Sequence, residues 1–312
     1  MTKSDSPLIP ALPETGNLWR TAQLHQLGLN SRSIRLLVGE RTLVRLRHGC
    51  YIRGSLWDRQ SAGSRSKQLI LAHAHGTLTT STGDFVYSHT SAARLHDLFL
   101  WNVDDLIHVL LKVCPSSDRL GRDVRGHTRP FTEDDVVMIG RLRVTSLERT
   151  VVDCSMMLSY RHALVLVDQA LRLGADPALM ETMADGLPGR RGIRNLRMAL
   201  VNADPRSESA GETLTREVIH RLKLPVPELQ VEVNSRAGRY RLDFAWKEKK
   251  IALEFDGKVK YFAYRPTGEA LFEERRREKA LTEEGWFFIR VEWRDLFREQ
   301  ELKNRILAAL RR

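Results

Sequence analysis

The chain has 312 residues, a length that predicts two or three domains rather than one core. Its content of 42% hydrophobic and 29% charged residues is typical of a globular protein and excludes general disorder. No apolar run reaches the roughly 18–20 residues that span a bilayer, so we expect no membrane partner. The formal charge of +11 favours nucleic acid or another anionic surface as the partner.

Two further features indicate the compartment. Residues 1–17, "MTKSDSPLIPALPETGN", lack the order of a signal peptide and predict a flexible arm. The three cysteines, Cys50, Cys114 and Cys154, lie far apart and form no CxxC pair. This spacing argues against a disulfide framework or a zinc finger, so we expect small buried side chains in a reducing cytoplasm.

Residues 18–56 predict a helix, a short turn, a second helix and a basic hairpin. "LWRTAQLHQLG" has helical spacing and stops at Gly28, and Asn30 or Ser31 is placed to cap "NSRSIRLLVGER". "TLVRLRHGCYI" alternates strictly and turns at "RHG" before a second strand. This order is that of a winged helix-turn-helix domain, whose second helix enters the major groove while its wing touches phosphate.

In such a domain six side chains are expected to face double-stranded DNA, three on the second helix and three on the wing. They are Arg32, Ser33, Arg35, Arg45, Arg47 and His48. The alternative is a small helical domain whose solvated basic face binds protein. The same run resembles the N-terminal winged helix of the AbiEi-type antitoxins of type IV toxin–antitoxin systems. The resemblance is carried by Leu27, Gly28, Leu43, Arg45, Arg47, Gly49 and Tyr51.

Residues 57–203 predict a central α/β region with no clear chemistry. "SHTSAARLH" and "TSLERTVVDC" resemble the region that follows the winged helix in the same antitoxin-like proteins. His89 and His96 fall on one predicted helix, but no G-x-S-x-G turn and no ligand-spaced partner accompany them. We therefore expect structural histidines. Arg149 is expected to pair with a carboxylate.

The polar stretch "NADPRSESAGE" predicts a boundary, after which residues 204–312 form one domain. The predicted order there is helix, three strands, helix, strand and helix, which suits a mixed sheet flanked by helices. Alternation places Asp243 on one strand, and Glu254 and Asp256 on the next. If these strands pair across "KEKK", Asp243 and Glu254 point into one spot.

Two carboxylates about 4 Å apart repel by about 1 kcal/mol in water and about 4 kcal/mol at an effective dielectric of 20. A positive charge must compensate for this repulsion. Mg²⁺ held by Asp243 and Glu254 is the usual solution, and it would steady the departing oxyanion of a phosphodiester. The alternative is a set of carboxylates that merely pairs with basic neighbours.

"RLDFAW", "IALEFDGKVKY" and "RRREKALTEEGWFFIRVEW" resemble the very-short-patch-repair-like branch of the PD-(D/E)XK nuclease superfamily. The resemblance implies that Asp243 and Glu254 are metal ligands and that Glu212 is the upstream acid. Asp256 stands at the position of the superfamily lysine, and Lys260 where the branch carries a histidine. Lys258 or Lys260 then becomes the candidate for orienting the attacking water.

The sequence thus predicts a mixed α/β protein with a winged helix-turn-helix domain, a central α/β region and a restriction-endonuclease-like domain. Its predicted function is to bind DNA and to cleave or nick it with Mg²⁺. The alternative is a non-enzymatic transcriptional regulator, an antitoxin with a cognate toxin as partner, whose C-terminal domain is an inert or dimerising scaffold that would make a homodimer. RNA as the substrate is a third alternative, because basic faces contact phosphate in both nucleic acids.

Overall fold

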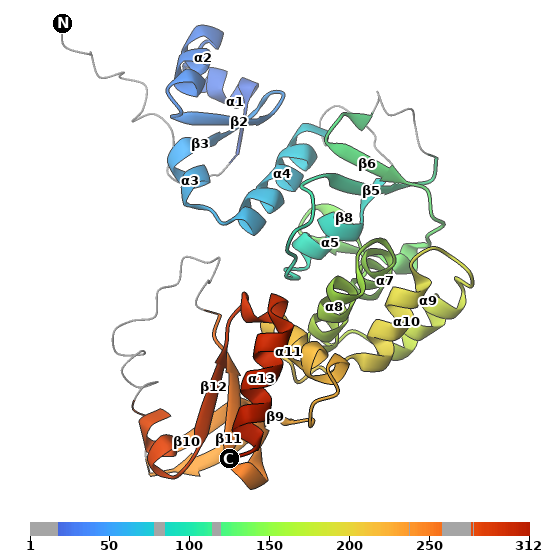
Figure 1. Ribbon diagram of the computed structural model, residues 1–312. Coiled ribbons are helices and arrows are strands. Elements are labelled where there is room, and N and C mark those ends of the chain that lie inside the picture. The colour runs from blue at the N-terminus through green and yellow to red at the C-terminus, as the bar shows by residue number, and fades with distance from the viewer. Residues whose placement is uncertain (1–17, 78–84, 114–119, 237, 258–275, 277) are drawn as a thin grey trace, which may run out of the picture. The chain divides into compact units, whose positions relative to one another are not determined.

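The computed structural model describes residues 18–77, 85–113, 120–236, 238–257, 276 and 278–312. The chain divides into two compact units, residues 1–146 (unit 1) and residues 147–312 (unit 2). Both units contain helices and β-sheet (Figure 1), and the described strands form three separate sheets in all. The predicted mixed α/β class is confirmed. Residues 1–17 and Cys114 lie outside the described residues.

Unit 1 begins with two short helices and a hairpin, at the positions that the sequence predicts. The elements are β1 (Trp19–Arg20), α1 (Thr21–Gln26), α2 (Ser31–Gly39), β2 (Leu43–Arg47) and β3 (Cys50–Arg53), with strand order β1-β3-β2. Asn30 caps α2, since its side chain accepts hydrogen bonds from the backbone N–H groups of Arg32 and Ser33. Ile34 and Leu37 of α2 are buried against Leu24. The local pattern therefore determines this part of the fold.

The strict alternation predicted for β2 is not what the strand shows. The register between β2 and β3 shifts between Arg45 and Arg47, where a bulge inserts an extra residue. Arg45 is exposed whereas Arg47 is half-buried. The two arginines therefore have different surroundings, although the sequence pattern places them on one face.

The rest of unit 1 is a five-stranded sheet with helices. Its elements are α3 (Gly54–Arg59), α4 (Ala62–Thr77), β4 (Phe85–Tyr87), α5 (His89–Leu95), β5 (Ile107–Leu111), β6 (Val124–His127), β7 (Val136–Ile139) and β8 (Leu142–Thr145). The strand order is β6-β5-β4-β8-β7, with β5 parallel to β6 and antiparallel to β4. Ile70 of α4 and Leu95 of α5 pack on Val109 and Val144 of this sheet. The sheet thus holds β4, β5 and β6 side by side.

Unit 2 opens with four helices, α7 (Leu147–Met157), α8 (Tyr160–Arg172), α9 (Pro177–Asp185) and α10 (Ile193–Asn202). Asp168 of α8 is fully buried and accepts hydrogen bonds from the Asp204 backbone, the Thr213 hydroxyl and the Arg216 guanidinium. These bonds tie α8 to the segment that follows residue 203. The two compact units accordingly divide between residues 146 and 147, within the region predicted to form one central domain.

The described elements of the C-terminal part of unit 2 follow the predicted order, and of the helix predicted before the last strand, residues 276 and 278–283 are described and helical. It contains α11 (Ala210–Arg221), β9 (Glu228–Ser235), β10 (Gly238–Trp246), β11 (Ile251–Phe255), β12 (Phe287–Val291) and α13 (Glu299–Leu310). The strand order is β12-β11-β10-β9, antiparallel except for the parallel pair of β11 and β12. Leu242, Ala252 and Leu281 are buried in its core. The sheet is therefore mixed, as the sequence predicts.

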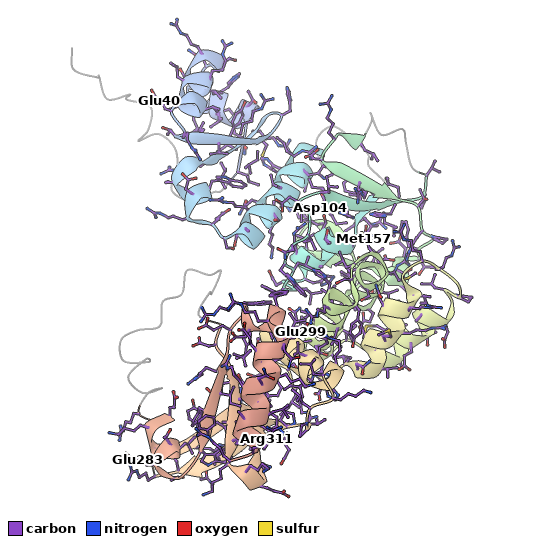
Figure 2. The ribbon with its side chains drawn as sticks, viewed as in Figure 1. Glu40, Asp104, Met157, Glu283, Glu299 and Arg311 are labelled. Carbon is purple, nitrogen blue, oxygen red and sulfur yellow. The ribbon has the colours of Figure 1, made fainter. Side chains whose placement is uncertain are left out.

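An ion-pair network holds α13 to the helices of the same unit. Glu299, labelled in Figure 2, lies 2.9 Å from Arg161 of α8 and 2.5 Å from Arg221 of α11. Glu217 contacts the same two arginines at 3.1 and 2.7 Å. Helix α13 is thereby joined to α8.

Among the described residues, no helix combines the length and the apolar character that crossing a bilayer demands.

Candidate functional site

The β10–β11 hairpin brings together the two carboxylates that the sequence singles out. Phe244 pairs with Leu253 in the antiparallel ladder, which places Asp243 and Glu254 at the next position, on the opposite face. The backbone N–H of Phe255 donates to Oδ2 of Asp243 at 2.9 Å. The turn between the strands is the 3-10 segment Lys247–Lys249, within the "KEKK" that the sequence predicts as a turn.

Glu212 approaches the same hairpin from α11. Ser209 caps this helix, accepting a hydrogen bond from the Glu212 backbone at 3.1 Å. The Glu212 side chain is 6% exposed, and its Oε2 accepts hydrogen bonds from the Glu208 backbone at 2.8 Å and from the Gln230 amide at 2.9 Å. These bonds fix the carboxylate in the first turn of the helix.

Close packing sets the distance between α11 and β11. A Cβ atom at Gly211 would lie 2.0 Å from the Phe255 ring, so only glycine lets the helix come this near to the strand. The ring also makes an edge contact with Trp293, with 5.6 Å between the ring centroids. Gly211 and Phe255 therefore position Glu212 relative to the hairpin.

The electrostatics of Asp243 follow from this crowding. Burial, followed by repulsion from Glu212, raises the pKa of Asp243 to about 7, and Glu254 and Glu208 add to the rise. Burial likewise raises the pKa of Glu212. Within the described part of the chain, neither side chain has a cationic partner at ion-pair distance. The pair thus lacks a compensating positive charge.

Glu254 differs from its neighbours because it has a partner. It lies opposite Arg290 in the parallel ladder of β11 and β12, and its Oε2 is 2.6 Å from the Arg290 guanidinium. The same guanidinium contacts Glu278 at 2.7 Å. The Glu254 side chain is buried, so this ion pair offsets the cost of burying its charge.

The remaining residues predicted for this site are Asp256, Lys258 and Lys260. Asp256 is half-buried just beyond β11, and its backbone N–H donates to the Val291 carbonyl at 2.7 Å. Lys258 and Lys260, the candidates for orienting water, lie outside the described residues. Their predicted role stays a prediction.

Gln230 is a site residue that sequence reasoning missed. Its φ of +52° is unusual for a residue in a strand, and the β9–β10 ladder is interrupted opposite Asp243. This local distortion accompanies the hydrogen bond from Gln230 to Glu212. A glutamine in an alternating strand carries no signal of such a backbone conformation, so only the structure could reveal it.

The predicted DNA-facing residues form a separate set in unit 1. Arg32 and Arg35 of α2, Arg45 of β2 and His48 of the turn are exposed, and they have no ion-pair partner among the residues that the structure describes. Ser33 is half-buried, and its hydroxyl donates to the Asn30 side chain at 3.2 Å. These four side chains remain available to an anion.

Arg47 is the exception in this set. Its guanidinium pairs with Asp123, and only 22% of its side chain is exposed. Its charge is already compensated within unit 1. A role in holding the hairpin is therefore better supported than the predicted contact with DNA.

The histidines of the central region give a mixed outcome. His96 is structural as expected, with Nε2 2.8 Å from the Thr145 carbonyl, and Arg149 pairs with Asp153 at 2.9 Å. His89 has no ligand-spaced partner in the sequence, but in the structure His108 and His127 lie beside it. Their sequence separation from His89 matches no local motif, and only the sheet brings them together.

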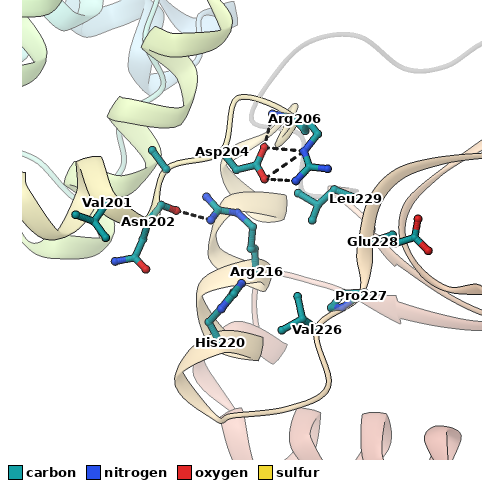
Figure 3. Close-up of a pocket in the computed structure, with 11 residues that line it drawn as sticks. Val201, Asn202, Asp204, Arg206, Arg216, His220, Val226, Pro227, Glu228 and Leu229 are labelled. Carbon is teal, nitrogen blue, oxygen red and sulfur yellow. Dashed lines mark hydrogen bonds and ion pairs between the residues drawn. The ribbon is translucent and has the colours of Figure 1, made fainter. Parts of the chain in front are cut away.

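A cavity of about 520 Å³ in unit 2 is lined by Arg206, Arg216 and His220, among other residues (Figure 3). Its arginines already have partners, since Arg206 binds Asp204 at 2.7 Å and Arg216 donates to the Asn202 carbonyl. Arg216 also binds the buried Asp168. The cavity therefore offers no uncompensated charge to a ligand.

No protein-family model matches the chain. Over 163 residues it is 34% identical to uncharacterized protein MT2308 of Mycobacterium tuberculosis (strain CDC 1551 / Oshkosh) and to uncharacterized protein Rv2248 of strain ATCC 25618 / H37Rv, covering 51% of this chain and 58% of each relative. The chain thus spans less than two thirds of the length of these curated relatives. It is also similar to the crystal structure of the RV2827C protein from Mycobacterium tuberculosis, with a TM-score of 0.39 and 14% identity over 70% of this chain and 84% of that chain.

Proposed function

We propose that this chain is a nucleic-acid-binding protein whose carboxylate cluster, defined as Glu212, Asp243 and Glu254, supports divalent-cation-dependent cleavage of a phosphodiester. The observation that carries the proposal is the pair of half-buried or buried acids, Asp243 and Glu212, with no cationic partner among the described residues. Burying carboxylates without compensation is costly, and such crowding is typical of sites that bind a cation.

The donor set fits Mg²⁺ or Mn²⁺ in its chemistry. Carboxylate oxygens are the ligands that such hard cations prefer, and a site of one or two carboxylates leaves room for phosphate oxygens and water. When bound, the ion would supply the positive charge that steadies the departing oxyanion. Asp243 and Glu212 would hold it, while the Arg290 pair keeps Glu254 ionised beside them.

The geometry is looser than that of an assembled metal site. Among the described residues, the three histidines of unit 1 are the one group of three such side chains whose ligand atoms all lie within 4.8 Å of one another. The carboxylate oxygens do not meet this spacing, so side-chain rotations would have to bring them together around an ion. Relief of the repulsion around Asp243 would favour those rotations.

The exposed cations of unit 1 support nucleic acid as the partner. Arg32, Arg35 and Arg45 present uncompensated positive charge on α2 and on the hairpin, and His48 of the turn is exposed. Phosphate contacts by such side chains dominate non-specific affinity for DNA. Binding through unit 1 and cleavage by unit 2 are separable, because each relies on its own residues.

A specific observation also favours the non-enzymatic alternative, a DNA-binding regulator. Glu254 is already neutralised by Arg290, and Asp243 can relieve its repulsion by taking a proton near pH 7. In that case the carboxylate cluster would need no metal ion. The two candidates differ in whether divalent ions bind at Asp243.

Metal binding and cleavage distinguish these candidates. We expect millimolar Mg²⁺ or Mn²⁺ to raise the melting temperature of the wild type, since a ligand that binds only the folded state stabilises it. The full chain should then nick supercoiled plasmid or cut short duplex DNA. Asp243→Asn and Glu212→Gln should lose both effects.

The matched control is Glu232→Gln, which removes an exposed carboxylate on β9 that pairs with Arg239. This variant should keep both effects. Metal binding without cleavage of any single- or double-stranded substrate would favour the regulator. A wild type indifferent to divalent ions would rule out the metal-dependent nuclease.

A further inference from the structure

Three histidines from three neighbouring segments of unit 1 converge on one point. His108 lies on β5 and His127 on the adjacent parallel strand β6, while His89 begins α5 directly after β4. One ring nitrogen from each lies within 4.8 Å of the other two. The sheet order places β4, β5 and β6 side by side, so the cluster follows from the topology.

The register explains the closest approach. Leu110 pairs with His127 in the parallel ladder, so His108, two residues earlier on β5, lies on the same face as His127. Nδ1 of His108 is 2.9 Å from Nε2 of His127. The rings of His89 and His127 stack with 3.7 Å between their centroids. Three imidazoles thus share one small volume.

Two of the rings have oxygen neighbours. Nδ1 of His89 is 3.0 Å from the Ser88 hydroxyl. Nε2 of His108 is 3.6 Å from Oδ1 of Asp104, a residue labelled in Figure 2. Metal-binding histidines usually have such oxygen partners on the second ring nitrogen, which orient the ring.

One buried nitrogen of the cluster is unsatisfied. Nε2 of His108 is fully buried and has no hydrogen-bond partner in the described part of the chain. Its distance of 3.6 Å from Asp104 is too long for a hydrogen bond. A small rotation of the His108 ring would close that gap. An ion on Nδ1 would favour this rotation, because it leaves the proton on Nε2, facing the carboxylate.

Arg125 and Arg129 carry positive charge close to His127. They oppose any cation electrostatically, so a strong nitrogen–metal bond is required.

We infer that His89, His108 and His127 form a binding site for one Zn²⁺ ion, with water or an anion in the fourth position. Imidazole nitrogen is a preferred ligand of zinc, and three protein ligands with an open position is a common zinc arrangement. Zinc–nitrogen bonds of about 2.1 Å place tetrahedral ligands about 3.4 Å apart, a spacing compatible with ring nitrogens that lie within 4.8 Å of one another. The stacked rings of His89 and His127 would have to tilt so that their lone pairs converge on one ion. This site is independent of the carboxylate cluster of unit 2.

A zinc titration of the full chain tests the inference. The protein is first stripped with a chelator, and Zn²⁺ is then added in competition with a chromophoric chelator. The expected result is one tight site per chain. His127→Gln should weaken it by about a hundredfold or more, and Ser88→Ala, which removes a second-nitrogen partner, by about ten- to a hundredfold. Co²⁺ in place of Zn²⁺ should give the visible absorption of a tetrahedral site, which His127→Gln should abolish.

Two control variants make the outcome specific. His25→Gln removes an exposed histidine of α1, and Glu232→Gln removes an exposed carboxylate of β9. Both should retain the zinc affinity of the wild type. If His127→Gln fails to fold by circular dichroism, Ser88→Ala carries the comparison. The inference is overturned if the wild type shows no saturable site, or if the folded variants bind zinc as tightly as the wild type.

Discussion

Asp243 and Arg47 show how the surroundings of one side chain decide its role. Asp243 sits among other acids, and its pKa rises to about 7 through burial and repulsion from Glu212. Arg47 was expected to contact DNA, yet Asp123 compensates its charge. Residue type and spacing identified both positions. The neighbours that set their chemistry come from distant parts of the chain, and the local pattern contains no information about them.

The raised pKa of Asp243 predicts a pH-dependent effect of Asp243→Asn. The folded-state pKa lies above the unfolded value of about 3.9, so folding favours the protonated form. The stability that this difference contributes is complete below about pH 4 and is lost as the pH rises through about 7, at a cost of at most about 4 kcal/mol. Asparagine carries no charge, so the variant avoids this loss.

We therefore expect Asp243→Asn to melt at a higher temperature than the wild type at pH 8 in metal-free buffer. The difference should shrink at pH 5.5, where the wild-type carboxyl is protonated. Differential scanning calorimetry at the two pH values measures this. Glu232→Gln should show no comparable trend, and a variant less stable than the wild type at pH 8 would contradict the assigned repulsion.

The affinity for divalent ions should depend on pH for the same reason. Near pH 7 a metal ion competes with the proton of Asp243, so the affinity should rise between about pH 6 and 8 and release up to one proton. Calorimetric titration with Mn²⁺ in buffers of different ionisation enthalpy measures the proton release. A pH-independent affinity would place the ion away from Asp243.

Helix α11 illustrates the element scale, since its packing against β11 sets the position of Glu212. Gly211 is the contact point, and the Phe255 ring lies where a larger residue would place its Cβ. The helix can therefore not be moved without moving the first-turn carboxylate. The contact of Gly211 with the Phe255 ring thus sets the position of Glu212, although neither residue belongs to the carboxylate cluster.

Gly211→Ala should lower the free energy of unfolding by about 1–3 kcal/mol, the usual cost of overpacking a core. Because the clash is with the Phe255 ring, the added substitution Phe255→Leu should recover part of this loss. Urea denaturation of the two single variants and the double variant gives the coupling energy. Additive losses would show that the ring is not the obstacle.

The helix α2 and its hairpin allow a test of nucleic-acid binding. Each phosphate contact adds about 0.9 to the log–log slope of affinity against salt, so Arg35→Ala with Arg45→Ala should flatten that slope by about two. Fluorescence anisotropy with a labelled duplex measures it between 50 and 200 mM salt. Arg47→Gln should change the slope little, because its charge is compensated. An unchanged slope in the double variant would move the binding surface elsewhere.

Sequence reasoning was most successful where periodicity is local. Alternation identified β10 and β11, and the polar residues before an apolar helix predicted Asn30 or Ser31 as the cap of α2, a role that Asn30 takes. It did not find the distortion at Gln230 or the bulge beside Arg47, because both depend on backbone conformation. The histidine cluster was missed for another reason, since its members meet only through the strand order of the sheet.

At the scale of the whole molecule, unit 2 is larger than the predicted C-terminal domain. The helices α7–α10 belong with the mixed sheet, and the buried Asp168 of α8 binds Arg216 at 2.6 Å. Breaking a buried ion pair by removing one partner typically costs about 3–5 kcal/mol. A fragment that starts at the predicted boundary would contain Arg216 without Asp168.

We accordingly expect residues 147–312 to fold as an isolated fragment and residues 204–312 to be unstable. Thermal unfolding of both fragments is measured by circular dichroism. The longer fragment should unfold cooperatively, and the shorter one should show no cooperative transition. The role of the buried ion pair is tested in the longer fragment, where Asp168→Asn removes the carboxylate that binds Arg216. This variant should be clearly less stable than the unmodified fragment 147–312. A stable, cooperative fragment 204–312 would support the boundary near residue 203.

The parallel pairing of β11 with β12 has a consequence for the newly made protein. Glu254 reaches the ribosome exit well before Arg290, and about 40 residues of synthesis take on the order of 2–8 s at usual rates. During that interval the nascent chain carries its acids without the Arg290 counter-charge. Because burying an unpaired charge is costly, we expect β11 to take its final buried place only after Arg290 has been made.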